Sequence, residues 1–276
     1  HLEVLYLINN RLAVLPPEIG ELKQLKILSL SDNQLKVLPL EIGELKKLIY
    51  LYLHNNKFTT LPAEIGELKQ LTYLDLSYGA GQAIGVFDLT GIEDFVNLKI
   101  LRCSGNQLTN LDVSNNSLLS RLFCGGNQIT NLNLQNNLSL MILRCGNNPL
   151  TSLDLSNNSF LIQMFCRNSL LTNLNIKNGN TISLDSLLIT NNPNLYCIEV
   201  NNINYANNNW TFANGSIDNQ HYFSTNCSGT AIKEYTTNKE LIKTNDILGQ
   251  QTHFKKKEVL FYIYDDGTVE KKYVIE

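Results

Sequence analysis

The chain of 276 residues has few charged side chains. Asp, Glu, Lys and Arg make up 17% of it, against about 25% in a typical soluble domain. The net charge is −3, so the sequence offers no broad basic surface for nucleic acid or for an anionic membrane. Its longest apolar stretches are far shorter than the roughly 20 residues that a transmembrane helix requires. We therefore expect neither a nucleic-acid partner nor a transmembrane segment.

Motifs that carry chemistry are also missing. The sequence has no nucleophile elbow, no phosphate-cradling glycine loop and no paired-carboxylate constellation. Its histidines are widely separated and lack ligand spacing: His1, His54, His221 and His253. The sequence therefore predicts a protein that is not an enzyme, with no catalytic residue, no metal site and no cofactor.

Two arrays of internal repeats account for much of the chain. In the first array Asn10, Asn33 and Asn56 recur every 23 residues within the pattern L-x-x-L-x-L-x-x-N-x-L. Each repeat continues as L-P-x-E-I-G-E-L, and a fourth unit opens at Leu71, with Gly79 where asparagine is expected. The L-x-L alternation predicts a short strand with inward-facing leucines. The L-P-x-E-I-G-E-L segment predicts a short helical or 3-10 return that its glycine closes.

The second array has a shorter period. Asn106, Asn127 and Asn148 recur every 21 residues, and Ser169 takes the fourth place. The unit reads L-x-x-L-x-C-x-x-N-x-L-T-x-L-D-V-S-N-N over residues 98–116. A longer unit starts at Leu184 and restores Asn192, and a degenerate last unit covers residues 195–200. Because L-D-V-S-N-N repeats the strand-and-turn pattern on a smaller scale, we expect a tight, nearly all-β coil.

The recurring asparagine stands at the turn that leaves each predicted strand. Its amide carries two donors and an acceptor, so it can satisfy backbone groups that the turn leaves without ladder partners. We expect these side chains to form a ladder along the stacked repeats: Asn10, Asn33, Asn56, Asn106, Asn127, Asn148 and Asn192.

Cysteines recur with the same period, which raises the possibility of a metal site. They are Cys103, Cys124, Cys145 and Cys166. Residues at equivalent places in stacked strands lie about 4.8 Å apart, so four such sulfurs span roughly 14 Å. A zinc ion holds its sulfur ligands at about 2.3 Å. We therefore interpret these cysteines as small buried apolar side chains. Asp112 and Asp154, with Asn133 at the equivalent place between them, are expected to be turn residues and not an acid–base pair.

These motifs resemble two groups of known repeats. Residues 2–76 resemble the bacterial leucine-rich repeats with the L-P-x-E-I-G-x-L signature. Residues 87–200 resemble the 21-residue repeats of Bacteroidetes surface proteins, including the lead-in D-L-T-G-I-E at 88–93. The resemblance implies an α/β solenoid with a parallel β-sheet on its concave face. Since the first five residues already fit the repeat pattern, we expect earlier repeats before His1.

The junction between the two arrays fits neither period, because Leu71 and Leu98 are 27 residues apart. We place it at residues 79–97, between the arrays at 1–78 and 98–200, and we note the glycines at 79, 81 and 85. An open repeat end would expose an apolar edge. We therefore expect the sheet to continue across the junction with a local bend; a flexible linker between two independent domains is the alternative.

Residues 201–228 follow the last repeat and contain the single tryptophan, Trp210. A terminal repeat requires a polar lid over its apolar end, and this aromatic, Asn-rich segment fits that role. It resembles the closing segment of the Bacteroidetes proteins, in which the matching cysteines pair. The resemblance implies a Cys197–Cys227 disulfide; two unpaired buried thiols are the alternative.

Residues 229–276 differ in character from the repeats. Strands are predicted at 241–249 and 259–264, with a D-D-G hairpin turn at 265–267 and a returning strand at 268–275. The region resembles a shortened C-terminal sorting domain of type IX secretion that lacks the usual Asn-Pro entry motif. The alternative is a small β appendage that packs on the end of the solenoid.

The solvent-facing strand positions are not dictated by the repeat, and they form two columns. One column reads Tyr6, Ser29, Tyr52, Asp75, Arg102, Phe123, Arg144 and Phe165. The other reads Val4, Ile27, Tyr50, Tyr73, Ile100, Arg121, Ile142 and Gln163. Tyrosine and arginine are enriched at binding hot spots. We expect the ligand site at Tyr6, Tyr50, Tyr52, Tyr73, Asp75, Arg102, Arg121, Phe123, Arg144 and Phe165; self-supporting cation–π packing is the alternative.

These features favour a non-catalytic protein-binding or adhesion module of a secreted or cell-surface bacterial protein. An intracellular interaction scaffold is the second hypothesis, and a carbohydrate-binding surface module is the third. The sequence does not name the ligand or the oligomeric state, since fold analogy does not select a partner.

Overall fold

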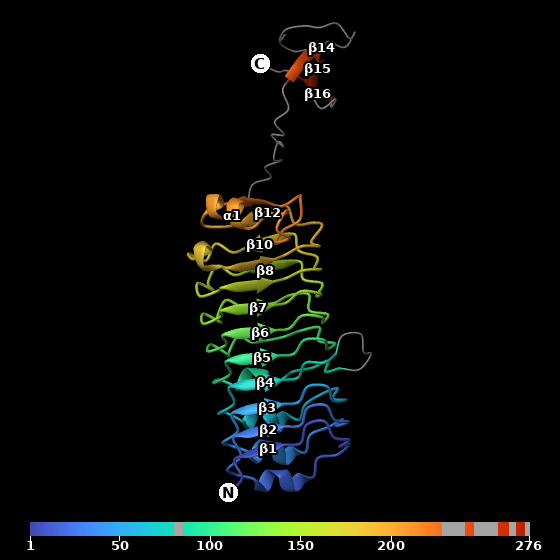
Figure 1. The fold of residues 1–276 in the computed structure, drawn as a ribbon, viewed down its shortest axis with the longest axis vertical. Coiled ribbons are helices and arrows are strands. Elements are labelled where there is room, and N and C mark those ends of the chain that lie inside the picture. The colour runs from blue at the N-terminus through green and yellow to red at the C-terminus, as the bar shows by residue number, and fades with distance from the viewer. Residues whose placement is uncertain (80–84, 228–240, 246–258, 265–268, 274–276) are drawn as a thin grey trace. The chain divides into compact units, whose positions relative to one another are not determined.

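The computed structural model describes residues 1–79, 85–227, 241–245, 259–264 and 269–273. The chain divides into two compact units, His1–Cys227 and Ser228–Glu276. In the first unit the chain coils repeatedly, and successive coils stack their strands side by side (Figure 1).

Each coil contributes one three-residue strand to a parallel sheet, which we call the main sheet. Within the described residues it has nine strands in the order β1-β2-β3-β4-β5-β6-β7-β9-β11. Their bounds are β1 Val4–Tyr6, β2 Ile27–Ser29, β3 Tyr50–Tyr52, β4 Tyr73–Asp75, β5 Ile100–Arg102, β6 Arg121–Phe123, β7 Ile142–Arg144, β9 Gln163–Phe165 and β11 Ser186–Leu188. This is the parallel sheet that the L-x-L alternation predicts.

The sheet continues across the junction of the two arrays. β4 pairs with β5 in parallel, with Leu74 opposite Leu101, although the two strands are separated by the longer connection. Phe95, within that connection, is completely buried in the same apolar core as the leucines of both arrays. Residues 80–84 of the glycine-rich stretch lie outside the described residues.

The core is a continuous stack of the inward-facing strand positions. The central residue of each strand from Leu28 onward is buried, through Leu51, Leu74, Leu101, Leu122, Leu143, Met164 and Leu187. Each such side chain stabilises the fold by about 1.5–3 kcal/mol through its burial. Every repeat packs only on its neighbours, so stability accumulates along the stack.

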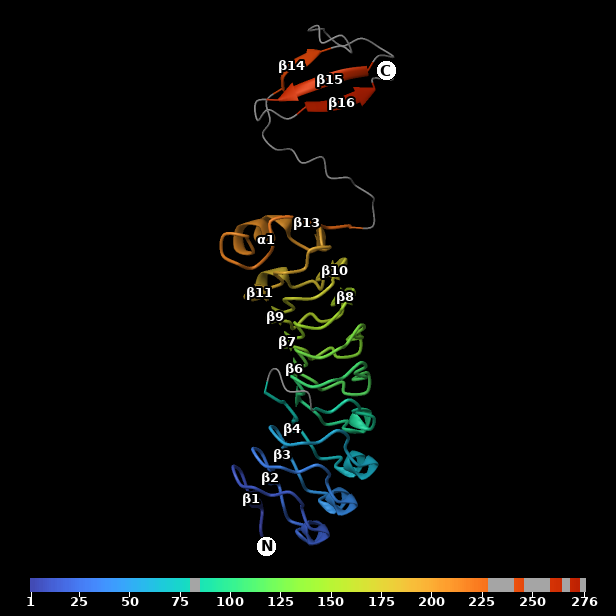
Figure 2. The same cartoon turned by 90° about the vertical axis from the view of Figure 1, so that its right-hand side faces the viewer.

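The return legs of the first array are 3-10 helices, as expected. They are η1 Pro17–Glu21, η2 Leu40–Glu44 and η3 Ala63–Glu67; the shorter η4 Ile92–Asp94 and η5 Thr181–Ser183 occur later. In Figure 2 the helices of the first array stack one above another, apart from strands β1–β4.

The role expected for the glycine in these return legs is wrong. Gly20 and Gly43 lie inside their helices, and the helix-ending positions are Leu22 and Leu45. A Cβ atom at Gly20 would lie 2.8 Å from the carbonyl oxygen of Glu41 in the next repeat, and one at Gly43 would lie 2.5 Å from that of Glu64. The glycines are therefore needed for the close approach of stacked helices.

A second parallel sheet forms on the return side of the second array. It contains β8 Ser152–Asp154, β10 Asn173–Asn175, β12 Cys197–Glu199 and β13 Tyr222–Ser224, in the order β13-β12-β10-β8. Residues 195–200, interpreted from sequence as a last degenerate repeat, instead supply β12 of this sheet. They are the return strand of the unit that begins at Leu184, because Ile198 pairs with Leu174 of β10, the return strand of the preceding unit.

The asparagine ladder binds backbone groups and not other asparagines of the ladder. Asn127 is representative: its Nδ2 donates to the carbonyl oxygens of Cys103 and Cys124 at 3.0 and 2.9 Å. Its Oδ1 accepts from the backbone N–H of Leu108 at 3.1 Å. Asn33, Asn56, Asn106, Asn148 and Asn192 make the same three kinds of bond. Asn10 is exposed and donates to Leu7 and Ile8.

A second asparagine ladder, which the sequence analysis did not single out, lies on the return side of the second array. Asn137 donates to the carbonyl oxygens of Val113 and Asn116 at 2.9 and 3.0 Å. Asn116 and Asn158 make the corresponding pairs of bonds in their own repeats. The second Asn of each L-D-V-S-N-N motif is therefore a structural residue.

The cap of the first unit contains α1 Ile203–Asn209 and β13. Trp210 is buried and packs edge-on against Tyr205 and Phe223, with ring centroids 5.8 Å apart in both pairs. Phe212, in contrast, is 65% exposed. Trp210, Phe223 and Tyr205 thus cover the apolar end of the last repeat, as a terminal lid requires.

The second unit contains an antiparallel sheet of β14 Leu241–Asn245, β15 Val259–Tyr264 and β16 Val269–Tyr273. All three lie within the predicted strands, and the predicted turn at 265–267 lies outside the described residues. In the part of the chain that is described, no helix has the length and apolar character needed to cross a membrane.

Candidate functional site

The two columns expected on the sheet surface are formed by strand pairing. We call the solvent-facing side of the main sheet the strand face. The first residues of the strands pair from Val4 through Tyr50 and Tyr73 to Arg121 and Gln163, and the third residues pair from Tyr6 to Phe165. The parallel register therefore brings the predicted ligand-site residues together in two rows.

Tyrosines dominate the strand face over β1 to β4. The Tyr73 ring in β4 contacts the rings of Tyr50 and Tyr52 in β3, with centroids 6.1 and 4.8 Å away. Tyr6 is the most exposed of the group, at 64%. Burial, together with the nearby carboxylate of Asp75, raises the pKa of Tyr73 to about 12. The Tyr73 phenol therefore stays neutral at physiological pH, and the tyrosine group offers apolar ring faces with polar hydroxyl tips.

Asp75 departs from its expected place as an exposed ligand-site residue, because only 5% of it is exposed. Its carboxylate accepts hydrogen bonds from the Tyr73 hydroxyl at 3.2 Å and from the Ser77 hydroxyl and backbone N–H at 2.6 and 3.0 Å. Arg102 Nε lies 3.5 Å away. Asp75 therefore positions the residues around it and links the tyrosine group to the arginines beyond.

His54 was not predicted as a site residue from the sequence, yet it lies beside Asp75 on the strand face. Its Nδ1 lies 2.9 Å from Ser31 Oγ and 3.5 Å from Asp75 Oδ2, and its Nε2 lies 3.6 Å from Asp32 Oδ2. Ser31 is completely buried, so its hydroxyl is inaccessible to a substrate. Among the described residues no group of His, Cys, Asp or Glu could hold a metal ion.

From β5 to β9 the strand face is an alternating stack of arginine and phenylalanine. The Arg102 guanidinium lies 5.1 Å from the Phe123 ring centroid, and that of Arg144 lies 5.3 Å from Phe123 and 4.8 Å from Phe165. Exposed contacts of this kind contribute about 0.5–1 kcal/mol each. The self-supporting packing considered from the sequence is present, and the arginines remain exposed.

The four periodic cysteines are buried in a column behind the strand face. Cys103, Cys124, Cys145 and Cys166 are free thiols with no measurable exposure. Burial raises the pKa of the Cys103 thiol to about 12, with a further contribution from Asp75, and burial also raises that of Cys124. Cys103 and Cys124 are therefore neutral packing groups in the core, whereas a hydrogen bond with Cys145 lowers the pKa of the Cys166 thiol.

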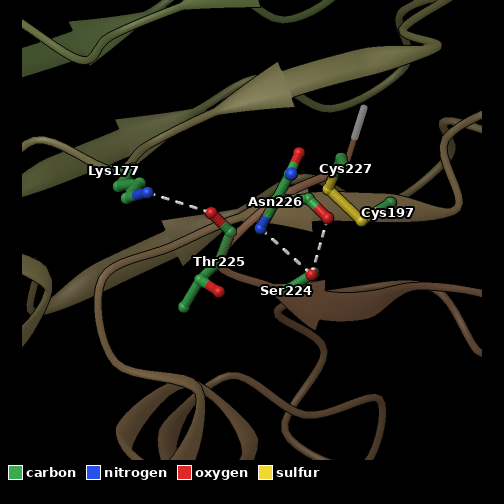
Figure 3. Close-up of a disulfide and its surroundings, with 6 residues drawn as sticks. All are labelled: Lys177, Cys197, Ser224, Thr225, Asn226 and Cys227. Atoms are coloured by element: carbon green, nitrogen blue, oxygen red, sulfur yellow. Dashed lines mark hydrogen bonds between the residues drawn. A yellow bond between two sulfur atoms is a disulfide. The ribbon is translucent and has the colours of Figure 1, made fainter. Parts of the chain in front are cut away.

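Cys197 and Cys227 are joined by a disulfide with an S–S distance of 2.00 Å (Figure 3). Around it, Lys177 Nζ donates to the Thr225 carbonyl at 3.0 Å, and the Ser224 hydroxyl donates to the Asn226 carbonyl at 2.8 Å. The disulfide therefore ties the end of the cap to the return strand of the last coil.

A family model described as a leucine-rich repeat region matches residues 1–196. The chain therefore belongs to the leucine-rich-repeat family, whose stacked repeats form extended binding surfaces. A comparison with curated proteins found no match.

Solved structures with similar folds come from several bacterial proteins. The functional domain of InlJ from Listeria monocytogenes, described as including a cysteine ladder, is 27% identical, with a TM-score of 0.55, and the alignment covers 72% of this chain and 48% of that one. A leucine-rich-repeat protein of Leptospira interrogans is 27% identical, with a TM-score of 0.53, and the alignment covers 72% of this chain and 62% of that one. The Listeria internalin inlF is 20% identical, with a TM-score of 0.60 and coverage of 73% and 61%, and is similar in fold alone. This chain thus covers 48–62% of the length of these proteins.

Proposed function

We propose that this chain is a non-catalytic protein-binding module whose ligand lies on the strand face. The observation that carries the proposal is the pairing register, which aligns exposed and half-exposed tyrosine, arginine and phenylalanine side chains in seven of eight successive strands of the main sheet. The repeat requires none of these residue types at solvent-facing positions. Aromatic residues and arginine combine large contact area with directed hydrogen bonds, which is the composition of binding hot spots.

We further propose that the module belongs to a secreted or cell-surface protein. The Cys197–Cys227 disulfide supports this location, because disulfides persist in oxidising compartments and are rare in the cytosol. In this proposal residues 1–78 and 98–200 form the binding surface, 79–97 join the arrays, 201–228 cap them, and 229–276 act as the sorting region. An intracellular scaffold would instead contain reduced Cys197 and Cys227.

Site-specific photo-crosslinking tests the binding surface. A photoreactive phenylalanine analogue replaces Tyr52 or Phe123 on the strand face, or Val37, which is 63% exposed and lies outside the strands. After exposure to extracts of the native host, we expect one protein to form adducts at Tyr52 and Phe123 but not at Val37. Adducts at Val37 alone, or equal adducts at all three positions, would place the ligand elsewhere.

Export tests the proposed location. Deletion of residues 229–276 should leave a folded solenoid that stays inside the native host, while the full chain reaches the surface. Fractionation and surface proteolysis distinguish the two proteins. Normal export of the shortened chain would contradict the role of residues 229–276 as a sorting region.

A further inference from the structure

The charge on the strand face changes sharply at the junction of the arrays. Between residues 98 and 170 the cations are Lys99, Arg102, Arg121, Arg144 and Arg167, and the acids are Asp112 and Asp154. The arginines lie in β5, β6 and β7 or just after β9, whereas Asp154 lies in β8 of the second sheet. Asp112 accepts a hydrogen bond from the backbone N–H of Ser114, in the same turn geometry that Asp154 adopts. A chain of net charge −3 therefore has a local cationic surface formed by Arg102, Arg121, Arg144 and Arg167. We call this surface the arginine strip.

Among the described residues only one cation of the arginine strip lies beside an acid: Arg102 Nε is 3.5 Å from the Asp75 carboxylate. In the first array four lysines form ion pairs, as Lys23 Nζ does with Glu44 at 2.9 Å and Lys46 Nζ does with Glu67 at 3.1 Å. Arg121 and Arg144, in contrast, form no ion pair with any residue that the structure describes, and both are exposed. Arg167 Nε donates to a neutral partner, the Thr190 hydroxyl, at 2.8 Å.

The phenylalanines hold Arg144 in place without using its hydrogen-bond donors. Its guanidinium contacts two rings, Phe123 and Phe165, at 5.3 and 4.8 Å. Stacking on ring faces restricts the long side chain and leaves the N–H groups at the edge of the guanidinium plane free. Those groups match the two oxygens of a carboxylate. Because the side chain is already ordered, less entropy is lost when a ligand binds.

We propose that the partner presents an acidic protein segment to the arginine strip. This inference rests on the proposed function and specifies the chemistry of the ligand. Arg102 and Arg144 are two strands apart in the same column, which corresponds to about 10 Å. Two carboxylates of the segment at this spacing pair with Arg102 and Arg144, and an apolar side chain between them packs on Phe123.

The borders of the arginine strip favour a short acidic segment over a long polyanion. On one side lie the carboxylates of Asp32 and Asp75, and on the other lie Asp185, just before β11, and Asp218, which accepts bonds from the backbone N–H groups of 191 and 192. The strands from β5 to β9 span only about 15 Å. A nucleic acid or a sulfated polysaccharide would extend beyond the strip onto these acids, where like charges repel.

Designed helical peptides test this inference with the full chain. Residues i and i+7 of a helix are about 10.5 Å apart on one face, so the first peptide carries Glu at i and i+7 with Leu between them. Matched peptides carry Gln in place of Glu, or Glu at i and i+4, which are only about 6 Å apart. Fluorescence anisotropy measures binding at about 50 mM and about 300 mM NaCl, and heparin is tested in parallel.

We expect the i, i+7 Glu peptide to bind about tenfold or more tightly than the Gln peptide, and more weakly at high salt. The Arg144→Gln variant should lose about tenfold in affinity, and Arg144→Lys should lose part of it because the planar fork is absent. Lys46→Gln, which removes a cation of the first array, is the matched control and should bind normally. Circular dichroism melting confirms that each variant is folded.

Several results would overturn the inference. The first is equal affinity of the chain for the Glu and Gln peptides, and the second is no measurable binding of the Glu peptide. The third is an Arg144→Gln variant that binds the Glu peptide with full affinity. The fourth is heparin binding that is tighter than peptide binding and is lost in Arg144→Gln. The proposed function fails separately. If crosslinks on the strand face capture a partner that the Arg144→Gln variant binds normally, the inference of an acidic segment is wrong, but the proposal that the strand face binds the partner is supported. If the strand face yields no crosslink and no peptide binds, both fail.

Discussion

Replacement of Asn127 with alanine removes one member of the asparagine ladder in the middle of the stack. Asn127 is 7% exposed, and its amide makes three hydrogen bonds to the backbone of two neighbouring coils. The carbonyl oxygen of Cys103 also accepts from Asn106, and that of Cys124 also accepts from Asn148. Both carbonyls therefore keep one donor in the variant, whereas the N–H of Leu108 loses its acceptor.

The expected cost follows from these contacts. A buried N–H without a partner costs about 1–3 kcal/mol, and each of the two other lost hydrogen bonds costs about 0.5–1.5 kcal/mol. Asn127→Ala should therefore lower the free energy of unfolding by about 2–6 kcal/mol. This is a large part of the roughly 5–15 kcal/mol that stabilises most proteins.

Urea titration followed by circular dichroism measures this change. Two variants serve as controls in the same assay. Asn115→Ala alters an exposed asparagine one repeat earlier and should change the free energy by no more than about 0.5 kcal/mol. Asn10→Ala removes an exposed ladder residue and should cost less than about 1 kcal/mol. A loss in Asn127→Ala no larger than in these controls would refute the ladder as a stabilising device.

Three further variants test other parts of the structure. Cys197→Ser should lower the free energy of unfolding by about 3–4 kcal/mol, because the disulfide closes a loop with a sequence separation of 30; unchanged stability, or sensitivity of the variant to reductant, would contradict this. Gly43→Ala should cost about 1–3 kcal/mol through overpacking, whereas Gly79→Ala, where a Cβ meets nothing within 4 Å, should be neutral; equal effects would disprove the close-approach argument. Burial lowers the pKa of His221 below its usual value, so the unfolded state binds more protons, and stability should fall as the pH drops below about 6.5. His221→Asn should reduce that slope in urea titrations at several pH values, and a slope that stays the same would exclude His221 as its source.

Much of the fold could be predicted because the same residue pattern recurs in successive repeats. A single L-x-L is weak evidence for a strand, but four of them spaced 23 residues apart, followed by three L-x-C units spaced 21 residues apart, leave few other arrangements. The same periodicity predicted the burial of Cys103 and its three counterparts. It also grouped Tyr52, Arg102 and Phe123 correctly into one column, because equivalent positions in a parallel stack must pair.

The errors occurred where the answer depended on the neighbouring coil. Gly43 looked like a helix-closing residue, and only the stacked coil shows that the Glu64 backbone leaves no room for a side chain. Asp75 occupies a solvent-facing strand position, yet Tyr73, Ser77 and Arg102 enclose its carboxylate. Residues 195–200 carry a repeat-like pattern, but pairing with β10 and β13 assigns them to the second sheet.

The sequence by itself determined the repeat lengths, the strand positions and the residues that share a column, since all of these follow from periodicity. Only the tertiary structure decided which polar side chains are buried, which glycines meet a backbone, and which arginines lack an anionic partner among the described residues. Those properties depend on contacts between residues of neighbouring coils, such as Glu44 and Lys23, which are 21 residues apart in the sequence. A repeat pattern records the place of each residue along one coil, whereas burial and charge pairing are set by the coils above and below it.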